Sequence, residues 1–365
     1  MINKYDINGP INIIRLENKQ LNKVIYLLGD YHLNPNQQFK CDNYESLDID
    51  KLLYKFLKKT NDYNDKKWDI LFEGKIFNID NNNIKLQSVK YSNRYIDSIK
   101  YLILKYFNYN INKDNKLNVH KSSTFANIRF HYIDIRYHNL NYLYELNSSR
   151  KYKWNIEMTK ILDIIKKNIL TDINSLYNKI DTITDKFFYK ILNQYNNSSN
   201  QTKISNIVNK ILLPYSKKII NIIESIKKYI TNKEKKIYLK KNNGNYYKNI
   251  SILREKIDIL DNNIENFYAM FMDLYTIRRI IDKNYNTNSI LYAGLAHCIN
   301  IINILVKNFD FNITHTYFKE VSINELNKKF KNEEYNYDNM NLQNLLLPEY
   351  LTQCTNMKNF PDMFL

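Results

Sequence analysis

Short apolar runs alternate with helix-like stripes over residues 1–150. The runs predict strands over residues 11–16, 24–28, 68–72 and 128–136, because short apolar segments bounded by turn residues are typical of buried strands. Apolar residues spaced three and four apart predict helices over residues 47–59 and 95–107, each with one apolar face. This alternation of strands and helices favours an α/β fold.

The pattern changes to long helices after residue 150, and the α/β pattern returns near the C-terminal end. The clearest helix covers residues 250–281, with loops expected at 196–201 and 232–245. A strand from Ser289, a turn at Gly294, a helix and a last strand follow. The sequence therefore predicts an α/β fold with a mostly parallel central sheet, flanking helices and a large all-helical insertion. The expected parts are a first half of the α/β domain (1–150), the helical insertion (151–284), a second half of the α/β domain (285–345) and an irregular tail (346–365).

Composition limits the classes of protein that fit this pattern. Hydrophobic residues make up 44% of the chain, which is enough for a sizeable core. The 32 tyrosines and 5 glycines, together with many Lys and Asn residues, are typical of an AT-rich genome. The net charge of +17 makes this a basic protein, but the lysines are spread along the whole chain, so a nucleic-acid partner is not favoured.

Two further features of the sequence bear on location and redox state. The longest apolar stretch, residues 290–306, is interrupted by His297, Asn300 and Asn303, so no transmembrane segment is expected. The N-terminal residues lack the apolar core of a signal peptide, which favours a cytoplasmic location. Three cysteines are too few for a disulfide framework, and reduced thiols are the expectation.

Three of the five glycines stand at the ends of apolar runs beside a His or a Glu. The motifs are Gly29-x-x-His32, Glu73-Gly74 and Gly294-x-x-His297. Ligands in open α/β sheets bind outside the carboxyl ends of the strands, so these motifs predict one convergent site that contains His32, Glu73 and His297. Each residue also has a structural alternative to a role in the site. His32 could simply belong to a turn, and His297 could pack at the start of a helix. Glu73 could cap a helix or form an ion pair with Lys75.

The residue types in this set suit two kinds of hydrolytic chemistry. His32, Glu73 and His297 match the ligands of Zn²⁺, Mn²⁺ or Co²⁺ with an open position for water, and a bound metal would lower the pKa of that water. Without a metal, Glu73 and one of the histidines could activate water directly as acid/base groups. The sequence leaves both alternatives open.

A second set of polar residues is predicted to bind the substrate. Asp134, Arg136 and His138 alternate at the end of an expected strand, and Arg278 interrupts the apolar stripe of the long helix. An arginine at a strand end could hold a carboxylate or a phosphate of the substrate. Structural ion pairs and a solvated helix face are the alternatives for this set.

These motifs resemble the TraB/TIKI group and its relatives, the ChaN-like haem-binding proteins and the erythromycin-esterase-like hydrolases. The resemblance rests on Gly29-x-x-His32, Glu73 and Gly294-x-x-His297, in the order in which that group shows them. The segments 134–138 and 272–278 also resemble members encoded by giant viruses. The resemblance implies an α/β fold with inserted helices and a His/Glu site, in either a metal-dependent peptidase or a metal-independent esterase. The chain departs from the TraB and TIKI proteins because it lacks their membrane segments.

Two functions from different classes follow from these observations. The first is a hydrolase that acts on a peptide or a small-molecule substrate, with a divalent metal (Mn, Zn or Co) as an open expectation. The second is a non-catalytic structural or binding protein, associated with a virion or with nucleic acid, that retains the fold. A viral origin would place either one in the host cytoplasm or in the virion. Convergence of His32, Glu73 and His297 favours the enzyme, whereas their separation favours the binding protein.

Overall fold

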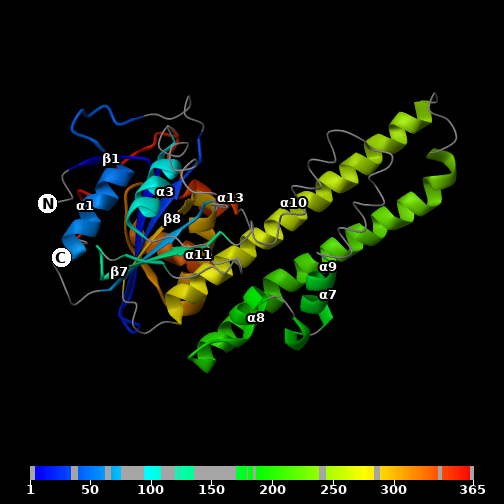
Figure 1. Ribbon diagram of the computed structural model, residues 1–365, viewed down its shortest axis with the longest axis horizontal. Helices are drawn as coiled ribbons and strands as arrows, with labels where there is room; N and C mark the ends of the chain where they lie inside the picture. The colour runs from blue at the N-terminus through cyan, green and yellow to red at the C-terminus, as the bar shows by residue number, and fades with distance from the viewer. Residues whose placement is uncertain are drawn as a thin grey trace. The chain divides into compact units, whose positions relative to one another are not determined.

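The apolar runs near both ends of the chain pair into one sheet of seven strands among the described residues. The computed structural model describes residues 5–33, 40–61, 67–74, 94–107, 120–122, 124–134, 170–178, 180–183, 186–237, 244–282, 288–335 and 339–361. The chain divides into two compact units, one made of residues 1–134 and 276–365 and the other of residues 135–275. The sheet belongs to the first unit (Figure 1).

The sheet has parallel strands in its centre and antiparallel strands at both edges. Its order is β6-β7-β5-β8-β3-β2-β9. The pairs β7/β5, β5/β8 and β8/β3 are parallel, and the outer pairs are antiparallel. A mostly parallel sheet was expected, so this prediction holds only for the centre. The strands are β2 (Asn12–Asn18), β3 (Lys23–Asp30), β5 (Trp68–Phe72), β6 (His120–Lys121), β7 (Ile128–Tyr132), β8 (Asn288–Gly294) and β9 (Asn312–Thr316).

Strand β8 lies between β3 and β5 although it comes more than 200 residues after them in the chain. Leu28 of β3 and Phe72 of β5 both pair with Tyr292 of β8. The three strands run parallel, so their carboxyl ends meet at one edge of the sheet. This topology places the ends of the three glycine-containing motifs next to one another.

Helices cover both faces of the sheet. Helices α1 (Ile49–Asn61) and α3 (Tyr95–Tyr106) lie on one face, and α11 (Leu295–Phe309) lies on the other (Figure 1). Two short helices, α12 (Ile323–Asn332) and α13 (Met340–Asn344), contact α11. The core under α1 and α3 is rich in aromatic rings, which supply large apolar area and edge-to-face contacts. Its largest members include Tyr26, Phe56, Phe72, Phe107, Phe130 and Tyr292.

A smaller sheet joins the two ends of the chain. It consists of β10 (Cys354–Asn356), β1 (Asp6–Asn8) and β4 (Leu47–Asp48), with β1 in the middle. Strand β10 lies in the segment 346–365, for which the sequence predicts no regular structure. A disulfide joins Cys41 to Cys354, and Cys298 is a buried free thiol. The expectation of three reduced thiols is therefore wrong, because the fold brings together two cysteines that are 313 residues apart.

Replacing Gly9, which follows β1, is expected to destabilise the first unit. Its φ of +137° is a conformation that only glycine adopts readily, and an added Cβ would lie 2.8 Å from Cγ2 of buried Ile49. We expect Gly9→Ala to lower the free energy of unfolding by about 1–3 kcal/mol, measured by urea denaturation. The exposed control Glu349→Ala should stay within about 0.5 kcal/mol of the unchanged chain. Equal stability of both variants would contradict this account of Gly9.

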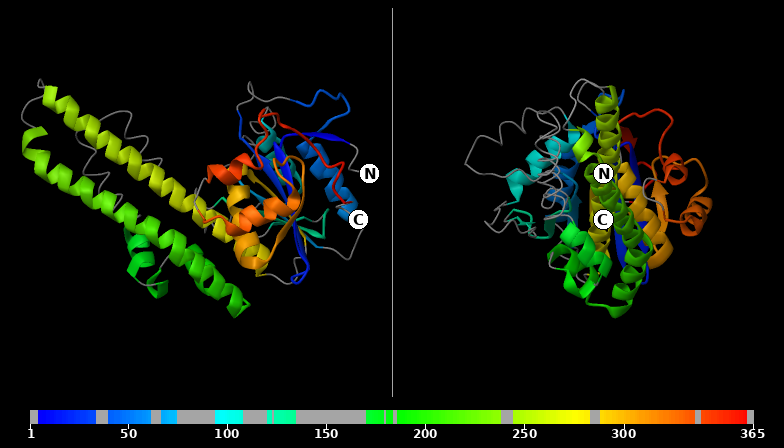
Figure 2. Two further views of the ribbon diagram at one scale, coloured as in Figure 1. Left: turned by 180° about the vertical axis from the view of Figure 1, so that it is seen from behind. Right: turned by 90° about the vertical axis from the view of Figure 1, so that its right-hand side faces the viewer.

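The described residues of the second unit are mostly helical. Its helices are α7 (Thr171–Asn178), the 3-10 helix η4 (Ile180–Thr182), α8 (Lys186–Asn193), α9 (Ser198–Ile237) and the main part of α10 (Gly244–Ile281). Helices α9 and α10 run side by side over most of their length (Figure 2). Buried residues at steps of three and four, such as Ile257, Leu260 and Ile264, give α10 its packed face. No described helix is long and apolar enough to span a bilayer.

The loop expected at residues 196–201 is mostly the first turn of α9. The side-chain oxygen of Asn197 accepts hydrogen bonds from the backbone N–H groups of Ser199 and Asn200, at 2.8 and 3.4 Å. Asn is among the best N-cap residues for this reason. The Asn/Ser run that suggests a loop in the sequence is thus a helix cap followed by helix. The expected loop at 232–245 is also too long, because α9 ends at Ile237 and α10 begins at Gly244.

Candidate functional site

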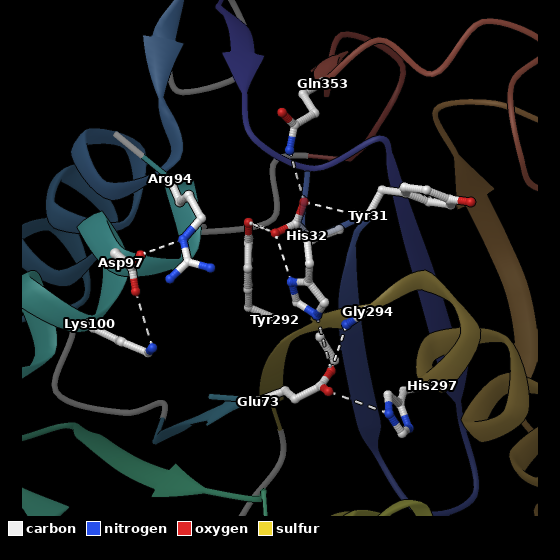
Figure 3. Close-up of polar contacts among 12 residues, drawn as sticks. Tyr31, His32, Glu73, Arg94, Asp97, Lys100, Tyr292, Gly294, His297 and Gln353 are labelled. Atoms are coloured by element: carbon white, nitrogen blue, oxygen red, sulfur yellow. Dashed lines mark hydrogen bonds and ion pairs between the residues drawn. The ribbon is translucent and has the colours of Figure 1, made fainter. Parts of the chain in front are cut away.

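The candidate site lies where three neighbouring strands end. Asp30 is the last residue of β3, Glu73 directly follows β5, and Gly294 is the last residue of β8. His32 stands two residues beyond β3, and His297 lies in the first turn of α11. Because β8 lies between the other two strands, these polar groups gather around its end (Figure 3).

The carboxylate of Glu73 lies between two imidazoles. Its Oε2 atom accepts a hydrogen bond from the backbone N–H of Gly294 at 2.7 Å and lies 3.6 Å from Nε2 of His32. Its Oε1 atom lies 3.4 Å from Nε2 of His297. The Glu73 side chain is only 6% exposed. The partial positive charge at the start of α11 also favours an anion here, so Glu73 is held as a buried carboxylate with one imidazole at each oxygen.

His32 is the most exposed of the three predicted residues. Its side chain is 37% exposed, against 7% for His297. Its backbone has a φ of +53°, a left-handed conformation that costs free energy in a residue other than glycine. This conformation turns the ring back over the end of the sheet, with Nδ1 3.3 Å from Asp30 Oδ2 and Nε2 facing Glu73.

The two carboxylates keep His32 protonated. Burial lowers the pKa of the imidazole, but hydrogen bonding to Asp30 and Glu73 and their negative charges outweigh it and raise the pKa from 6.5 to about 10. At neutral pH the ring is therefore an imidazolium with both N–H groups directed at carboxylates. In this form His32 is a proton donor and a positive charge, and it is no base.

Asp30 orients His32 from behind. Its Oδ1 accepts hydrogen bonds from the backbone N–H of Tyr31 at 2.8 Å and from Nε2 of Gln353 at 3.0 Å. Its Oδ2 accepts one from the Tyr292 hydroxyl at 2.8 Å. Burial raises the pKa of Asp30, but hydrogen bonding to His32, Tyr292 and Gln353 outweighs this and holds that pKa below its usual value. Burial raises the pKa of Tyr292 well above 10, so its hydroxyl remains a donor.

The sequence analysis missed these supporting residues for separate reasons. Asp30 stands inside the Gly29-x-x-His32 motif, and its position beside His32 was a visible signal. Tyr292 lies within an apolar strand, where a tyrosine is indistinguishable from a core residue. Gln353 lies in the segment expected to be an irregular tail, and no local pattern indicates its contact with Asp30.

A charged cluster on α3 was also missed. The buried carboxylate of Asp97 forms two ion pairs (Figure 3). Its Oδ2 lies 2.7 Å from Nε of Arg94, and its Oδ1 lies 3.1 Å from Nζ of Lys100. Lys100 runs along the backbone just after Glu73, since a Cβ added to Gly74 would lie 3.0 Å from its Cε. The only signal in the sequence is the spacing of three residues from Arg94 to Asp97 and from Asp97 to Lys100, which is typical of ordinary surface ion pairs.

Of the residues predicted to bind substrate, Asp134 follows β7, the parallel neighbour of β5, and therefore lies at the same edge of the sheet as Glu73, whereas Arg278 lies elsewhere. Arg278 is buried in the last turn of α10, with Nη2 4.0 Å from Oδ2 of Asp282. The charge of Asp282 acts on Lys23, the first residue of β3, so this pair lies at the amino ends of the strands. Asp134 is buried two residues after β7. Arg136 and His138 lie outside the described residues.

The distances between Glu73 and each of the two histidines are those of two ligands on one metal ion, but the three side chains together do not surround a single ion. Two ligands about 2.1 Å from a tetrahedral ion lie roughly 3.4 Å apart, which matches the separations of Glu73 from His297 and from His32. These separations involve different oxygens of Glu73, however, and one oxygen already accepts the Gly294 N–H. No group of three His, Cys, Asp or Glu side chains within the described ranges is arranged to hold a metal. The divalent metal stays a prediction, and the present arrangement suits proton transfer.

Comparison with known proteins relates the chain to proteins of a giant virus. A family model described as "Family of unknown function (DUF5847)" matches residues 5–242 and 212–365. The chain is 29% identical to uncharacterized protein R706 of Acanthamoeba polyphaga mimivirus, over 98% of this chain and 96% of that protein. Proteins R160 and R161 of the same virus are 28% and 29% identical over at least 97% of each protein. No solved structure matches the chain significantly.

Proposed function

The chain belongs to this giant-virus family of unknown function, and we propose from its site that it is a hydrolase of ester or amide bonds. The observation that carries the proposal is the placement of the Glu73 carboxylate between the imidazoles of His32 and His297 at the ends of adjacent strands. The order of these residues resembles that of the TraB/TIKI-like and erythromycin-esterase-like hydrolases, which supports the same reaction class. The substrate class is a peptide or a small-molecule ester.

Glu73 is the base of the proposed reaction. A carboxylate can take a proton from water as the water oxygen attacks the carbonyl carbon of the substrate. His297 lies against the Oε1 atom and the Gly294 N–H holds the Oε2 atom. These contacts fix the carboxylate between the two imidazoles, so little reorganisation is needed before proton transfer.

His32 is the acid of the proposed reaction. Its imidazolium can stabilise the negative charge that develops on the carbonyl oxygen, and its Nε2–H can protonate the leaving alcohol or amine as the carbon–heteroatom bond breaks. Glu73 then holds the proton taken from water, and His32 has lost one. Transfer of that proton across the 3.6 Å between Glu73 Oε2 and His32 Nε2 restores both groups.

Asp30 holds His32 in the orientation that this reaction needs. It contacts Nδ1, so Nε2 is the nitrogen that faces Glu73 and the substrate. This arrangement follows the general logic in which a carboxylate orients a histidine that exchanges protons with the reacting groups. His32 and its neighbour Tyr31, which is 50% exposed, are both accessible to solvent. A substrate can therefore reach the proton donor His32 from solvent.

The proposal is tested by hydrolysis of p-nitrophenyl esters and of aminoacyl p-nitroanilides, with metal content measured on the same protein. We expect the purified wild-type chain to hydrolyse part of this panel above the rate of buffer, with EDTA present. A stoichiometric Mn, Zn or Co ion whose removal abolishes activity would establish the metal-dependent alternative. Failure of the wild-type chain across the panel, both with EDTA and with each added metal, would contradict the proposal.

Replacing Gly294 should impair the site without unfolding the protein. A Cβ added there would lie 3.2 Å from Nε2 of His32 and 3.5 Å from Oε2 of Glu73, whereas the φ of −54° suits alanine. We therefore expect Gly294→Ala to lower kcat on the order of tenfold, since small displacements of reacting groups cost that much or more. The free energy of unfolding should change by less than about 1 kcal/mol. Unchanged kcat would show that the contact between His32 and Glu73 is not needed.

A further inference from the structure

The disulfide and the candidate site are connected through one side chain. Gln353 is 1% exposed, and its Nε2 donates a hydrogen bond to Oδ1 of Asp30 at 3.0 Å. Asp30 in turn contacts Nδ1 of His32 at 3.3 Å through its other oxygen. Gln353 immediately precedes Cys354, which is bonded to Cys41. Three consecutive links, namely the Cys354–Gln353 peptide bond, the hydrogen bond to Asp30 and its contact with His32, therefore lead from the disulfide to the acid of the proposed reaction. Figure 3 shows the part from Gln353 to Glu73.

Gln353 is held in place by its backbone and by the neighbouring disulfide. Its backbone carbonyl oxygen accepts a hydrogen bond from the N–H of Gly9 at 3.0 Å, and the strand that follows, β10, pairs with only three residues of β1. On the other side of the disulfide, the N–H of Cys41 donates to Oδ1 of Asn8 at 2.7 Å. A three-residue strand at the edge of a small sheet is weakly stabilised by itself, so the covalent bond to Cys41 adds to the restraint that the packing of Met357 and Phe360 in the core supplies.

Asp30 depends on this restraint for its contacts. A buried carboxylate accepts hydrogen bonds only, so it needs donors on each oxygen. Oδ1 of Asp30 accepts hydrogen bonds from two donors, the side-chain amide of Gln353 and the backbone N–H of Tyr31. Loss of the Gln353 amide would allow the carboxylate to rotate about its side chain, and His32 would lose its fixed orientation.

We propose that Gln353 is a positioning residue for His32 and that the Cys41–Cys354 disulfide keeps it there, so that reduction of the disulfide lowers the activity of the site. This inference rests on the proposed function, because it assigns a form of regulation to the same site. The reductant is a low-molecular-weight thiol or a dithiol. The S–S bond takes up two electrons and two protons to give two cysteine thiols, and two reductant thiols become one disulfide.

Thiol counting establishes whether the Cys41–Cys354 disulfide is formed. Under denaturing conditions the purified chain should show one free thiol, that of Cys298, and three after treatment with dithiothreitol. The imidazole ¹⁵N shifts of His32 then report on its environment without any substrate. We expect these shifts to change on reduction, and to change in the same direction in Gln353→Leu. The neighbouring exposed control Thr352→Leu should leave them unchanged.

Kinetics on the hydrolysed substrate complete the test. Reduction and Gln353→Leu should each lower kcat on the order of tenfold with little change in KM, because Gln353 is 1% exposed and acts through Asp30. The variant Cys41→Ser/Cys354→Ser should match the reduced wild-type chain and should not respond further to dithiothreitol, which excludes an effect of Cys298. If that variant does not fold, Gln353→Leu with its disulfide intact replaces it, and its kcat should not fall further on treatment with dithiothreitol.

The outcomes separate this inference from the proposed function. Three free thiols before reduction, or equal kcat and equal His32 shifts in the oxidised and reduced chains, would overturn the inference while hydrolysis remained. A response of the His32 shifts to reduction in a chain that hydrolyses nothing would support the positioning of His32 by Gln353 and contradict the hydrolase.

Discussion

Glu73→Gln is expected to lower kcat by about 10³-fold or more, because the variant has lost the base that takes the proton from water. Glutamine has nearly the same shape, and its amide oxygen can still accept the hydrogen bond from the Gly294 N–H. The amide cannot accept a proton from water at neutral pH. The loss should therefore appear in kcat, with KM changed little, since substrate binding does not depend on proton transfer.

The matched control for this variant is Glu325→Gln in α12. Glu325 carries the same functional group, but its side chain is 52% exposed and pairs only loosely with Lys329. Its replacement should leave kcat, KM and the free energy of unfolding unchanged within error. Hydrolysis by Glu73→Gln at the wild-type rate would contradict the assignment of the base, whatever the substrate.

The second large effect is expected from His32, through the pH dependence of kcat. The folded-state pKa is raised from 6.5 to about 10, and the active form is the protonated one. Activity should therefore be fully present at pH 7 and should fall as the pH rises through about 10. His32→Gln should lower kcat by about 10²–10⁴-fold at neutral pH, which is the usual contribution of a general acid, and the remaining activity should lack this alkaline limb.

The same pKa values give the sign of the effect on stability. A raised pKa means that the folded state binds the proton of His32 more tightly than the unfolded state does. The contribution of His32 is thus complete below pH 6.5 and is lost as the pH rises through about 10. Asp30 behaves in the opposite way, because its pKa is lowered by its donors. Its contribution is present above its unfolded pKa and is lost as the pH falls through the folded one.

Local sequence patterns predict the elements of the first unit well. The strand at residues 68–72 is β5, and the expected helix at 95–107 is α3 to within one residue. The strands expected at 11–16 and 24–28 are β2 and β3, which pair in antiparallel orientation. These segments are short, strongly apolar and bounded by polar turns, so periodicity alone defines them.

The arrangement of these elements depends on contacts that no local pattern contains. Strand β8 enters between β3 and β5 after more than 200 intervening residues, and the antiparallel edges of the sheet follow from the path of the chain. The motifs identified His32, Glu73 and His297, because a glycine beside a polar residue at a strand end is visible in the sequence. Tyr292 and Gln353 were not visible, since their roles come from one tertiary hydrogen bond each to Asp30.

The central claim is that His32 and Glu73 form one coupled site, and the most direct test is an NMR titration of the imidazoles between pH 5 and pH 11. The chain contains six histidines, and His32→Gln assigns the relevant resonance. We predict a pKa of about 10 for His32 in the wild-type chain and a lower pKa in Glu73→Gln, because the variant has lost one of the two negative charges beside the ring. A pKa near 6.5 for His32 that is unchanged by Glu73→Gln would contradict the coupling and the mechanism built on it.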